Sequence, residues 1–381
     1  MQADFHYYAT YCAAILAGYS HEEAIDICYS AQFVDCCTKT YLKSVGASIH
    51  AATSQSQAEL VDTRADFIGL QDITRIWASF HFLPQDLNAV TPRATKTYKN
   101  KYRLICGPNG DLVKNTVELA KSSSLQASGI AMHVLADTWA HMYFAGTPSL
   151  VINNTTNDFY EVMFDGTLEK ISFKHAPGAS DDIEGFTYNS TVFNPSETNI
   201  LNLGHGHAGH LPDYSFIRYK YLPAWGGYRE CLKDNPSDYR KAFGQMIYAM
   251  KYLRGEEAVF ETDTYDEEAI KPCEERIMEI LTKRRPDASE DWKAFGEELS
   301  GGIIPDFDVD KYSDEYKTAE DKDNTFLGRF IIAALSQKSM VTNKIFNSGN
   351  NLAGFSIDFR KKGFGGIKDY MKLVREKRKT T

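Results

Sequence analysis

The chain has 381 residues, of which 43% are hydrophobic and 13% aromatic, so it can bury one large hydrophobic core or two smaller ones. Its formal net charge of −9 argues against a nucleic-acid coat protein, and we expect nucleic acid not to be a stable partner. No stretch approaches 18 uninterrupted apolar residues, the opening residues lack the basic segment of a signal peptide, and the seven cysteines form no C-x-x-C pair. We therefore expect a cytoplasmic protein without a transmembrane segment.

Two helices are predicted at the start of the chain. Asp4 is suited to begin the first, which continues to about Ala17 and ends at Gly18. Ser20 and Glu23 have the spacing of a capping box, in which each side chain bonds the backbone N–H of the other residue. They predict the beginning of a second helix.

Three polar residues in this N-terminal part are candidate metal ligands. His6 lies on the side of the first helix that carries small apolar residues. Asp35 closes the second helix, where a carboxylate opposes the helix dipole and needs a compensating partner such as a cation. His81 follows residues 70–80, which are typical of a strand or a helix end, and is either a packed aromatic residue or a ligand. Residues 45–65 predict a loop or an edge segment.

The most informative stretch runs from His133 to His141. Read as a helix, it places His133, Asp137 and His141 on one face, with neighbouring Cβ atoms about 5–6 Å apart. Serines precede the helix as candidate N-caps, and Gly146 with Pro148 should end it. The flanking residues are mostly apolar, so the helix should be buried. Two imidazoles and a carboxylate then need compensation, either from hydrogen bonds or from a metal ion.

A histidine-rich run follows an irregular region. Residues 149–203 alternate turn signals with short strand-like runs and predict an insert with some hairpin structure. Between residues 204 and 213, three histidines alternate with three glycines, which let a backbone pass close to an ion. The alternative is a flexible surface loop. We expect His210, with either Asp213 or His207, to reach a metal centre.

The rest of the chain predicts helices at 237–253, 267–283 with a break at Pro272, 290–299 and 324–346. Residues 360–381 hold nine Lys or Arg against two acids, and we expect a solvated terminal helix there. The predicted fold class is therefore mainly α, a multi-helix bundle around a buried metal site with the insert at 149–203. Residues 1–220 would form the metal-binding core and residues 221–381 a helical region packed on it, within the same domain or as a second one.

The candidate ligands are histidines and aspartates without cysteine, which suits two or three zinc ions, with manganese or iron as alternatives. The full set is His6, Asp35, His81, His133, Asp137, His141, His207, His210 and Asp213. An aspartate between two histidine ligands can bridge two ions, and a pair about 3.5–4 Å apart activates water for a phosphoryl displacement. Asp35 or Asp137 would be the catalytic residue that orients this water.

The order of these motifs resembles the zinc-dependent phospholipase C and P1 nuclease superfamily. The resemblance covers about residues 1–215. In chain order, the residues that carry it are an early His (His6), an Asp that closes the second helix (Asp35), a lone His (His81), the pair His133 and Asp137, then His141, and finally His210 with Asp213. It implies an all-α fold, three zinc ions and phosphodiester hydrolysis. In that family the later His follows the Asp by six residues instead of four, and an N-terminal Trp supplies its amine to zinc. The first eight residues and the run Ala136–His141 also resemble an uncharacterised bacterial family.

The predicted function is a metal-dependent hydrolase that acts on a small-molecule or lipid phosphoester through a metal-activated water. Two alternatives remain. A helical di-iron or di-manganese redox protein would usually carry Glu-x-x-His pairs, which these histidines lack. A non-enzymatic binding or toxin-like protein would use its ions only to hold the helices together.

Overall fold

The computed structural model describes residues 1–56, 58–60, 67–93, 95–147, 149–176, 179–190 and 204–350, and the fold is mainly helical, as predicted. The predicted solvated helix at 360–381 lies outside the described residues. One hydrophobic core draws on helices from both the predicted metal-binding core and the C-terminal region. In the described part of the chain, no helix has both the length and the apolarity needed to cross a membrane.

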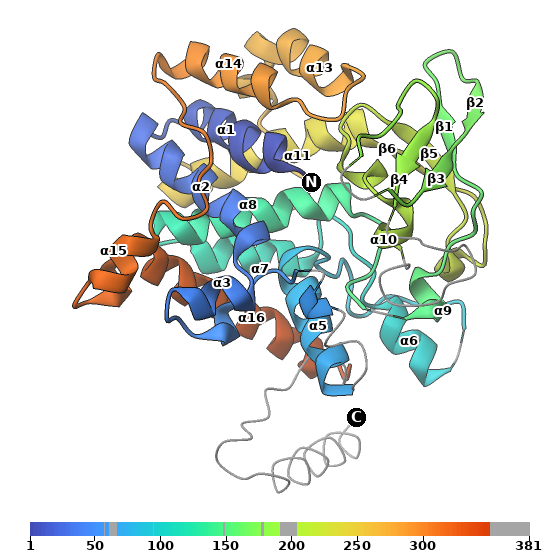
Figure 1. The fold of residues 1–381 in the computed structure, drawn as a ribbon, viewed down its shortest axis with the longest axis horizontal. Helices are drawn as coiled ribbons and strands as arrows, with labels where there is room; N and C mark the ends of the chain where they lie inside the picture. The colour runs from blue at the N-terminus through green and yellow to red at the C-terminus, as the bar shows by residue number, and fades with distance from the viewer. Residues whose placement is uncertain are drawn as a thin grey trace, which may run out of the picture.

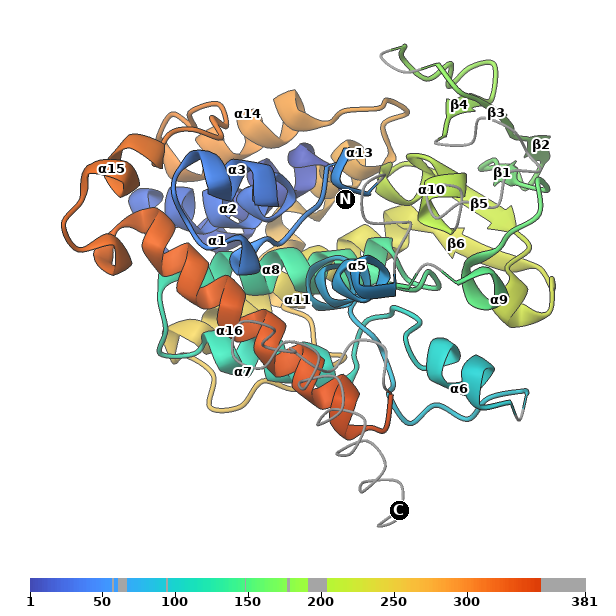
Figure 2. The ribbon, with the colours of Figure 1, turned by 60° about the horizontal axis from the view of Figure 1, so that its bottom comes forward.

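Helix α8 (Leu125–Ala140) lies at the centre of the bundle (Figures 1 and 2). Its residues from Gln126 to Ala140 are all buried, because the helix is covered on every side by other helices. These neighbours are α2 (His21–Cys36), α5 (Phe67–Phe80), α7 (Asp111–Ala120), α11 (Asn235–Arg254) and α16 (Phe326–Asn347). Ser124 caps the helix by accepting a hydrogen bond from the backbone N–H of Ala127 (3.2 Å), which confirms the predicted serine cap.

The predicted end of this helix near Gly146 is wrong. The last helical residue is Ala140, and His141 follows at the C-cap with its N–H still bonded to the Asp137 carbonyl (2.9 Å). Beyond it, Tyr143 adopts a positive φ of 79° and its N–H pairs with the carbonyl of Cys106 (3.0 Å). A tertiary backbone contact, which local sequence does not encode, therefore replaces the last helical turns.

The N-terminal helices lie where the sequence predicts them, but the predicted cap by Asp4 is wrong, because Ala3 is the N-cap and Asp4 is already the first helical residue. A π-helical turn η1 (Asp4–Ala9) leads into α1 (Thr10–Leu16), and the capping box that begins α2 is present. The Ser20 N–H donates to Glu23 Oε2 (2.9 Å), and the Glu23 N–H donates to Ser20 Oγ (3.3 Å). Residues 70–80 were predicted as either a strand or the end of a helix, and the structure shows a helix there, α5. The segment predicted as a loop contains the 3-10 turn η2 (Ile49–Ala51) and follows α3 (Lys39–Ser44).

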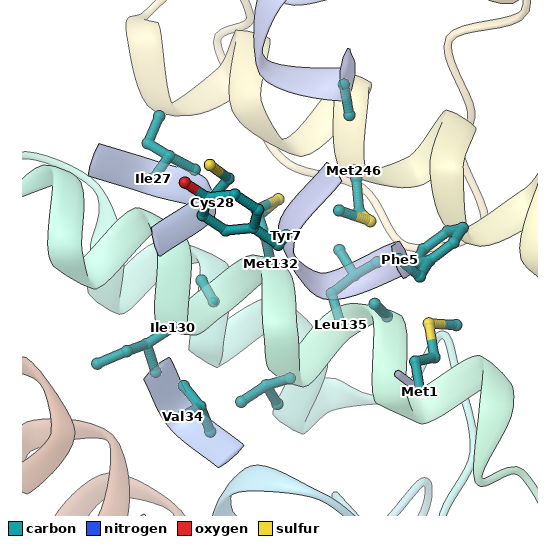
Figure 3. Packing of buried hydrophobic residues seen from close by; sticks show 14 of the residues in the cluster. Met1, Phe5, Tyr7, Ile27, Cys28, Val34, Ile130, Met132, Leu135 and Met246 are labelled. Carbon is teal, nitrogen blue, oxygen red and sulfur yellow. The ribbon is translucent and has the colours of Figure 1, made fainter. Parts of the chain in front are cut away.

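The core seen in Figure 3 joins the first residues of the chain to the central helix. Met1 and Phe5 pack beside Leu135 of α8 and Met246 of α11, and all four side chains are almost fully buried. This packing holds the N-terminal segment against the face of α8 that carries His133 and Asp137.

The predicted insert is present as a small sheet region. Strands β1 (Tyr160–Val162) and β2 (Leu168–Lys170) form an antiparallel hairpin, and β3 (Ser172–Lys174) pairs in parallel with β4 (Thr187–Asn189). The sequence analysis missed β5 (Arg218–Tyr221) and β6 (Cys231–Asp234), which extend the first sheet in the order β2-β1-β5-β6. Each of these two strands has only four residues, too few for a clear period. Residues 191–203 of the predicted insert lie outside the described residues.

The C-terminal helices match their predicted positions, including the break at Pro272. They comprise α11 and α16 above, with α12 (Glu267–Ile270), the turn η6 (Lys271–Cys273), α13 (Glu274–Thr282) and α14 (Ser289–Ser300). The short helix α15 (Ser313–Thr318) was not predicted. The remaining short elements are α6 (Lys96–Tyr102), α9 (Leu150–Asn153), α10 (His205–Ala208), and the 3-10 turns η4 (Leu211–Asp213), η5 (Ala224–Gly226) and η7 (Lys322–Asn324).

The contact between α2 and α8 depends on Gly129. A Cβ atom at this position would lie 2.4 Å from the Ile27 carbonyl oxygen and 2.5 Å from Ser30 Cβ. Alanine normally stabilises a helix by about 1 kcal/mol relative to glycine, but here the helices would have to separate. We expect Gly129→Ala to lower the free energy of unfolding by about 1–3 kcal/mol in urea titrations.

The matched control is Gly226→Ala, because the nearest atom to its added Cβ lies 3.6 Å away. An unchanged or increased stability of Gly129→Ala would show that the two helices are less closely packed than described.

Candidate metal centre

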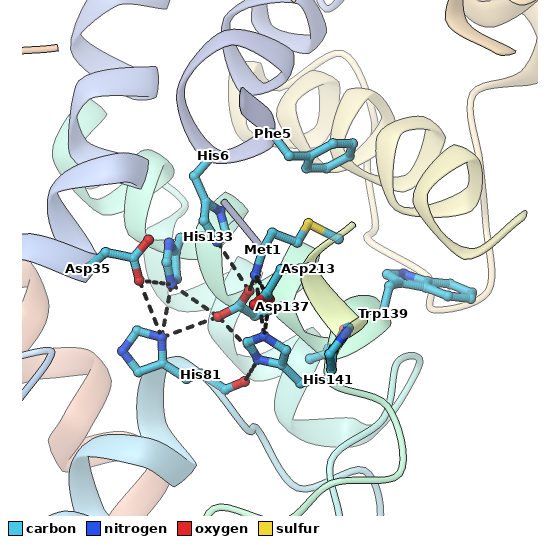
Figure 4. Close-up of polar contacts among 12 residues, drawn as sticks. Met1, Phe5, His6, Asp35, His81, His133, Asp137, Trp139, His141 and Asp213 are labelled. Atoms are coloured by element: carbon cyan, nitrogen blue, oxygen red, sulfur yellow. Dashed lines mark hydrogen bonds and ion pairs between the residues drawn. The ribbon is translucent and has the colours of Figure 1, made fainter. Parts of the chain in front are cut away.

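The carboxylate of Asp137 is the centre of the site. It is 1% exposed, and each of its oxygens faces nitrogen atoms from several elements (Figure 4). Oδ1 lies 2.8 Å from the amino nitrogen of Met1 and 3.1 Å from His6 Nε2. Oδ2 lies 3.2 Å from both His81 Nδ1 and His133 Nε2. The helix α8 thus presents one carboxylate to residues that come from η1, from the end of α5 and from its own preceding turn.

A first group of donors surrounds Oδ2. His133 Nε2 and His81 Nδ1 lie 3.3 Å apart, and the Oδ1 atom of Asp35 lies 3.9 Å and 3.7 Å from them. Asp35, in the last turn of α2, is the most exposed carboxylate of the site, with a side chain 33% accessible. This group therefore faces solvent on one side.

Backbone carbonyls fix which nitrogen of each imidazole carries the proton. His133 Nδ1 lies 2.9 Å from the Ala31 carbonyl oxygen, and His81 Nε2 lies 2.9 Å from that of Thr53. A carbonyl oxygen only accepts, so these nitrogens donate, and in the neutral rings the opposite nitrogens present lone pairs to Asp137. Such backbone contacts are typical of histidines that bind metal ions.

The lone pairs of His81 and His133 point at each other and at a carboxylate, which is repulsive unless a cation lies between them. A tetrahedral zinc ion with bonds of about 2.0–2.1 Å holds its ligand atoms about 3.3–3.4 Å apart. The distances of 3.2–3.3 Å among His81, His133 and Asp137 match this spacing. A proton on His81 is the alternative cation, because Asp137 and Asp35 raise the pKa of its imidazole against the effect of burial.

A second group surrounds Asp213. Its Oδ1 atom lies 3.3 Å from His141 Nε2 and 3.2 Å from both His205 Nε2 and the Met1 amino nitrogen. Met1 and His141 Nε2 are in turn 3.3 Å apart. The His141 Nδ1–H donates to the His81 carbonyl (2.6 Å), so its Nε2 also presents a lone pair. The spacing of this group is again that of a tetrahedral ion.

A third group shares Asp137 Oδ1. It consists of His6 and His133 with that carboxylate, and the Met1 nitrogen lies next to it. The His6 ring stacks on that of His133, with centroids 3.8 Å apart. Its Nδ1 atom is buried and has no hydrogen-bond partner among the described residues. Because His133 presents only Nε2 to the site, one ion at most can use it, so Asp137 is the residue placed to bridge two groups.

The site has more negative than positive charge. Burial lowers the pKa of His6, His133 and His141 to about 4, so these imidazoles are neutral at pH 7. Burial alone would favour neutral aspartic acids, yet the surrounding nitrogens hold the pKa of Asp137 and of Asp213 well below the usual value. Despite burial, these carboxylates raise the pKa of the Met1 amine to about 11. The Met1 ammonium and the His81 imidazole, whose pKa is raised, face three carboxylates, and bound cations would offset the remaining negative charge.

Seven of the nine sequence-predicted ligands meet in these groups: His6, Asp35, His81, His133, Asp137, His141 and Asp213. The structure does not bring the other two into any group. His207 is buried and stacks on Phe159, with ring centroids 5.7 Å apart. His210 is 52% exposed, and its Nδ1 atom lies 3.9 Å from Asp213 Oδ2.

Sequence reasoning missed His205, which takes the place expected for His210. It belongs to the four-residue helix α10, which two glycines flank, Gly204 with φ 55° and Gly209 with φ 59°. These turns decide which histidine of the run faces Asp213. The run itself was the only signal in the sequence, and it does not distinguish His205 from His207 or His210.

The C-terminal region holds parts of the site in place. Asn235, at the start of α11, donates from Nδ2 to the carbonyls of Leu211 (2.8 Å) and Tyr214 (2.7 Å), on either side of Asp213. Lys338 of α16 donates to the carbonyls of His50 (2.8 Å) and Ala52, next to Thr53, whose carbonyl orients His81. Residues beyond 220 thus position the first group, through His81, and the second group, through Asp213.

Comparison with known proteins gives a family without an assigned activity. A family model described as "Family of unknown function (DUF6765)" matches residues 1–345, and the chain belongs to this family. No curated protein and no solved structure matches the chain.

The buried imidazoles predict a pH dependence of the metal-free protein. An unfolded chain binds protons on His6, His133 and His141 below about pH 6.5, whereas the folded protein binds them only near pH 4. These three imidazoles should therefore lower the free energy of unfolding of chelator-treated protein as the pH is lowered from 6.5 to 4. The pKa values of His81, His210, Asp4 and Asp35 are raised in the folded protein and act in the opposite direction, so the three imidazoles are tested by comparing variants.

Urea unfolding at several pH values measures this slope. His133→Gln should reduce the slope, and the exposed control His50→Gln should leave it unchanged. An equal slope in His133→Gln and wild type would contradict the description of the site.

Proposed function

We propose that this member of the DUF6765 family is a metal-dependent hydrolase of phosphoesters, with zinc as its ion. One observation carries the proposal: lone pairs of fixed imidazole tautomers converge on aspartates at the spacing of tetrahedral ligands. Hydrogen bonding alone explains this poorly, because a buried lone pair that faces another lone pair costs free energy. The resemblance to the phospholipase C and P1 nuclease superfamily supports the same reading.

Three ions would use different subsets of the donors. Asp35, His81, His133 and Asp137 would hold one ion, and His141, His205 and Asp213 a second. His6 with Asp137 would hold a third, and the Met1 nitrogen would join them by releasing a proton. Such ions supply a water of lowered pKa and stabilise the charge that develops on phosphoryl oxygens.

The residues of the chain supply the remaining chemistry. Asp137 is too deeply buried to touch a substrate and acts by fixing the positions of the donors around it. Asp35 is the accessible carboxylate, and burial raises its pKa above the ordinary value, so it is suited to accept a proton from an attacking water. The water oxygen bonds to phosphorus while Asp35 takes one of its protons, and the ester P–O bond breaks. The leaving oxygen takes a proton from solvent and departs as an alcohol. Phe82 stacks on His141, with centroids 4.8 Å apart, and restricts the position of that ring.

Metal content tests whether His205 or His210 binds the proposed second ion. We expect His205→Ala to lose about one equivalent of zinc relative to wild type, because it removes one of three donors around Asp213. His210→Ala is the matched control from the same run and should retain the wild-type content. Elemental analysis of untagged, dialysed protein measures both. Equal zinc loss in the two variants, or none in either, would contradict the assignment of an ion to His141, His205 and Asp213.

Activity separates a catalytic from a structural site. Asp35→Asn removes the proton acceptor from the accessible edge of the site, and we expect a 10²–10⁴-fold loss of turnover, in the usual range for general-base removal. Turnover is measured with bis(p-nitrophenyl) phosphate and with phosphatidylcholine as substrates. The melting temperature of each variant shows whether it is folded. Asp137→Asn should lose turnover while partly keeping metal.

If the ions only hold helices together, wild type would hydrolyse neither substrate, and Asp137→Asn would show its effect as a lower melting temperature. That result would favour the non-enzymatic alternative. Bound iron or manganese with redox activity would favour the di-metal alternative.

A further inference from the structure

Three short elements form one face beside the metal centre, which we call the α6–α9 face. It consists of α6, α9 and the turn η5 with the residues flanking them, and the two helices lie together in Figures 1 and 2. Tyr98 of α6 donates to the Trp225 carbonyl (2.8 Å), and Lys101 Nζ donates to Thr147 Oγ1 (2.8 Å). The Trp225 indole N–H donates to the carbonyl of Tyr143 (2.8 Å). These bonds make the face a single packed unit.

The charge of this face is opposite to that of the chain. Residues 87–110, 138–157 and 214–229 contain eight Lys or Arg and no Asp or Glu, although the whole chain has 51 acidic residues against 42 basic ones. Two of the eight, Arg218 and Lys220, form ion pairs with Asp234 and Glu230. Five of these bases lie between residues 93 and 103. Among the described residues, none of these five has a carboxylate within salt-bridge distance: Arg93, Lys96, Lys99, Lys101 and Arg103. Arg93, Lys96 and Lys99 are exposed and available to an external anionic partner, whereas Lys101 Nζ is bonded to Thr147 and Arg103 Nε to the Ala89 carbonyl.

Apolar side chains are exposed on the same face. Val90 is 93% exposed, Leu150 and Val151 of α9 are 45% and 42% exposed, and Tyr228 is 44% exposed. Tyr228 lies next to α9, because its hydroxyl accepts a hydrogen bond from Asn154 Nδ2 (3.0 Å). Tyr102, Tyr143 and Trp225 are half-buried around them.

We propose that the α6–α9 face docks this protein on the surface of an anionic lipid membrane. Exposed aliphatic side chains, rings with a polar edge and unpaired lysines and arginines are the combination that binds a lipid interface. A nucleic-acid surface would use the bases and aromatic rings but leave Leu150 and Val151 without a partner. The aliphatic residues therefore favour a lipid bilayer over nucleic acid.

The face is continuous with the metal centre. Tyr143, which packs against Trp225 with ring centroids 5.8 Å apart, follows the ligand His141 by two residues. A membrane held by this face would lie beside the ligand groups and supply lipid phosphoesters at high local concentration. This inference specifies the substrate class of the proposed hydrolase, but membrane binding itself does not depend on hydrolysis.

Vesicle co-sedimentation of the full chain tests the proposal. We expect wild type to sediment with vesicles of phosphatidylglycerol and phosphatidylcholine in a 3:1 ratio, to bind pure phosphatidylcholine at least tenfold more weakly, and to dissociate as salt is raised. Lys96→Glu with Lys99→Glu should weaken binding at least tenfold, and so should Leu150→Ser with Val151→Ser. The matched control combines Arg329→Glu with Ile332→Ser, which exchanges an exposed base and an exposed apolar residue on α16.

One further double variant and one further condition separate loss of charge from loss of folding, and membrane binding from hydrolysis. Lys96→Arg with Lys99→Arg keeps the charge and should bind like wild type, and circular dichroism shows whether each variant folds. Chelator-treated protein should still bind vesicles, so membrane binding without any phosphoester hydrolysis would support the face and overturn only the proposed function. Hydrolysis of soluble phosphodiesters without vesicle binding would overturn only the face.

Wild-type binding that none of these substitutions weakens would overturn the proposal and direct attention to another basic segment, such as residues 360–381. A DNA oligonucleotide that binds tighter than the vesicles, with the same lysine dependence but no dependence on Leu150 and Val151, would also overturn it in favour of nucleic acid.

Discussion

The fold depends on keeping one carboxylate charged in the interior of a helical bundle. Asp137 is almost completely buried, and nitrogen atoms from distant parts of the chain surround it. An isolated buried carboxylate would take up a proton, so these neighbours determine its charge state. The burial of α8, the docking of the N-terminal segment on it and the placement of α5 are each needed to bring those nitrogens together.

The same constraint gives the C-terminal region a purpose that its sequence does not show. Lys233 is fully buried, donates to the Trp139 carbonyl (2.7 Å) at the end of α8 and pairs with Asp238 (2.6 Å). With Asn235 and Lys338, it connects the later part of the chain to the segments that carry the ligands. The candidate ligands lie within residues 1–215, but these contacts from beyond residue 220 set the positions of several of them.

The regular parts of the site could be predicted from the sequence, because helical spacing fixes which side chains share a face. His133 and Asp137 follow from that rule, and Asp35 from its unfavourable place at the end of a helix. The choice of His205 could not be predicted, because it depends on two glycine turns around a helix too short to show a period. The Met1 nitrogen and the early end of α8 depend on tertiary contacts between distant residues, which local patterns do not encode.

The most direct test of this account is anomalous X-ray diffraction at the zinc edge, from crystals of protein supplied with zinc during purification. We predict anomalous peaks at two or more positions, one among His81, His133 and Asp137 and another among His141, His205 and Asp213. Peaks confined to surface residues, or no peak between these donors, would contradict it. The histidines and aspartates would then form a buried hydrogen-bonded core in which protons take the place of metal ions.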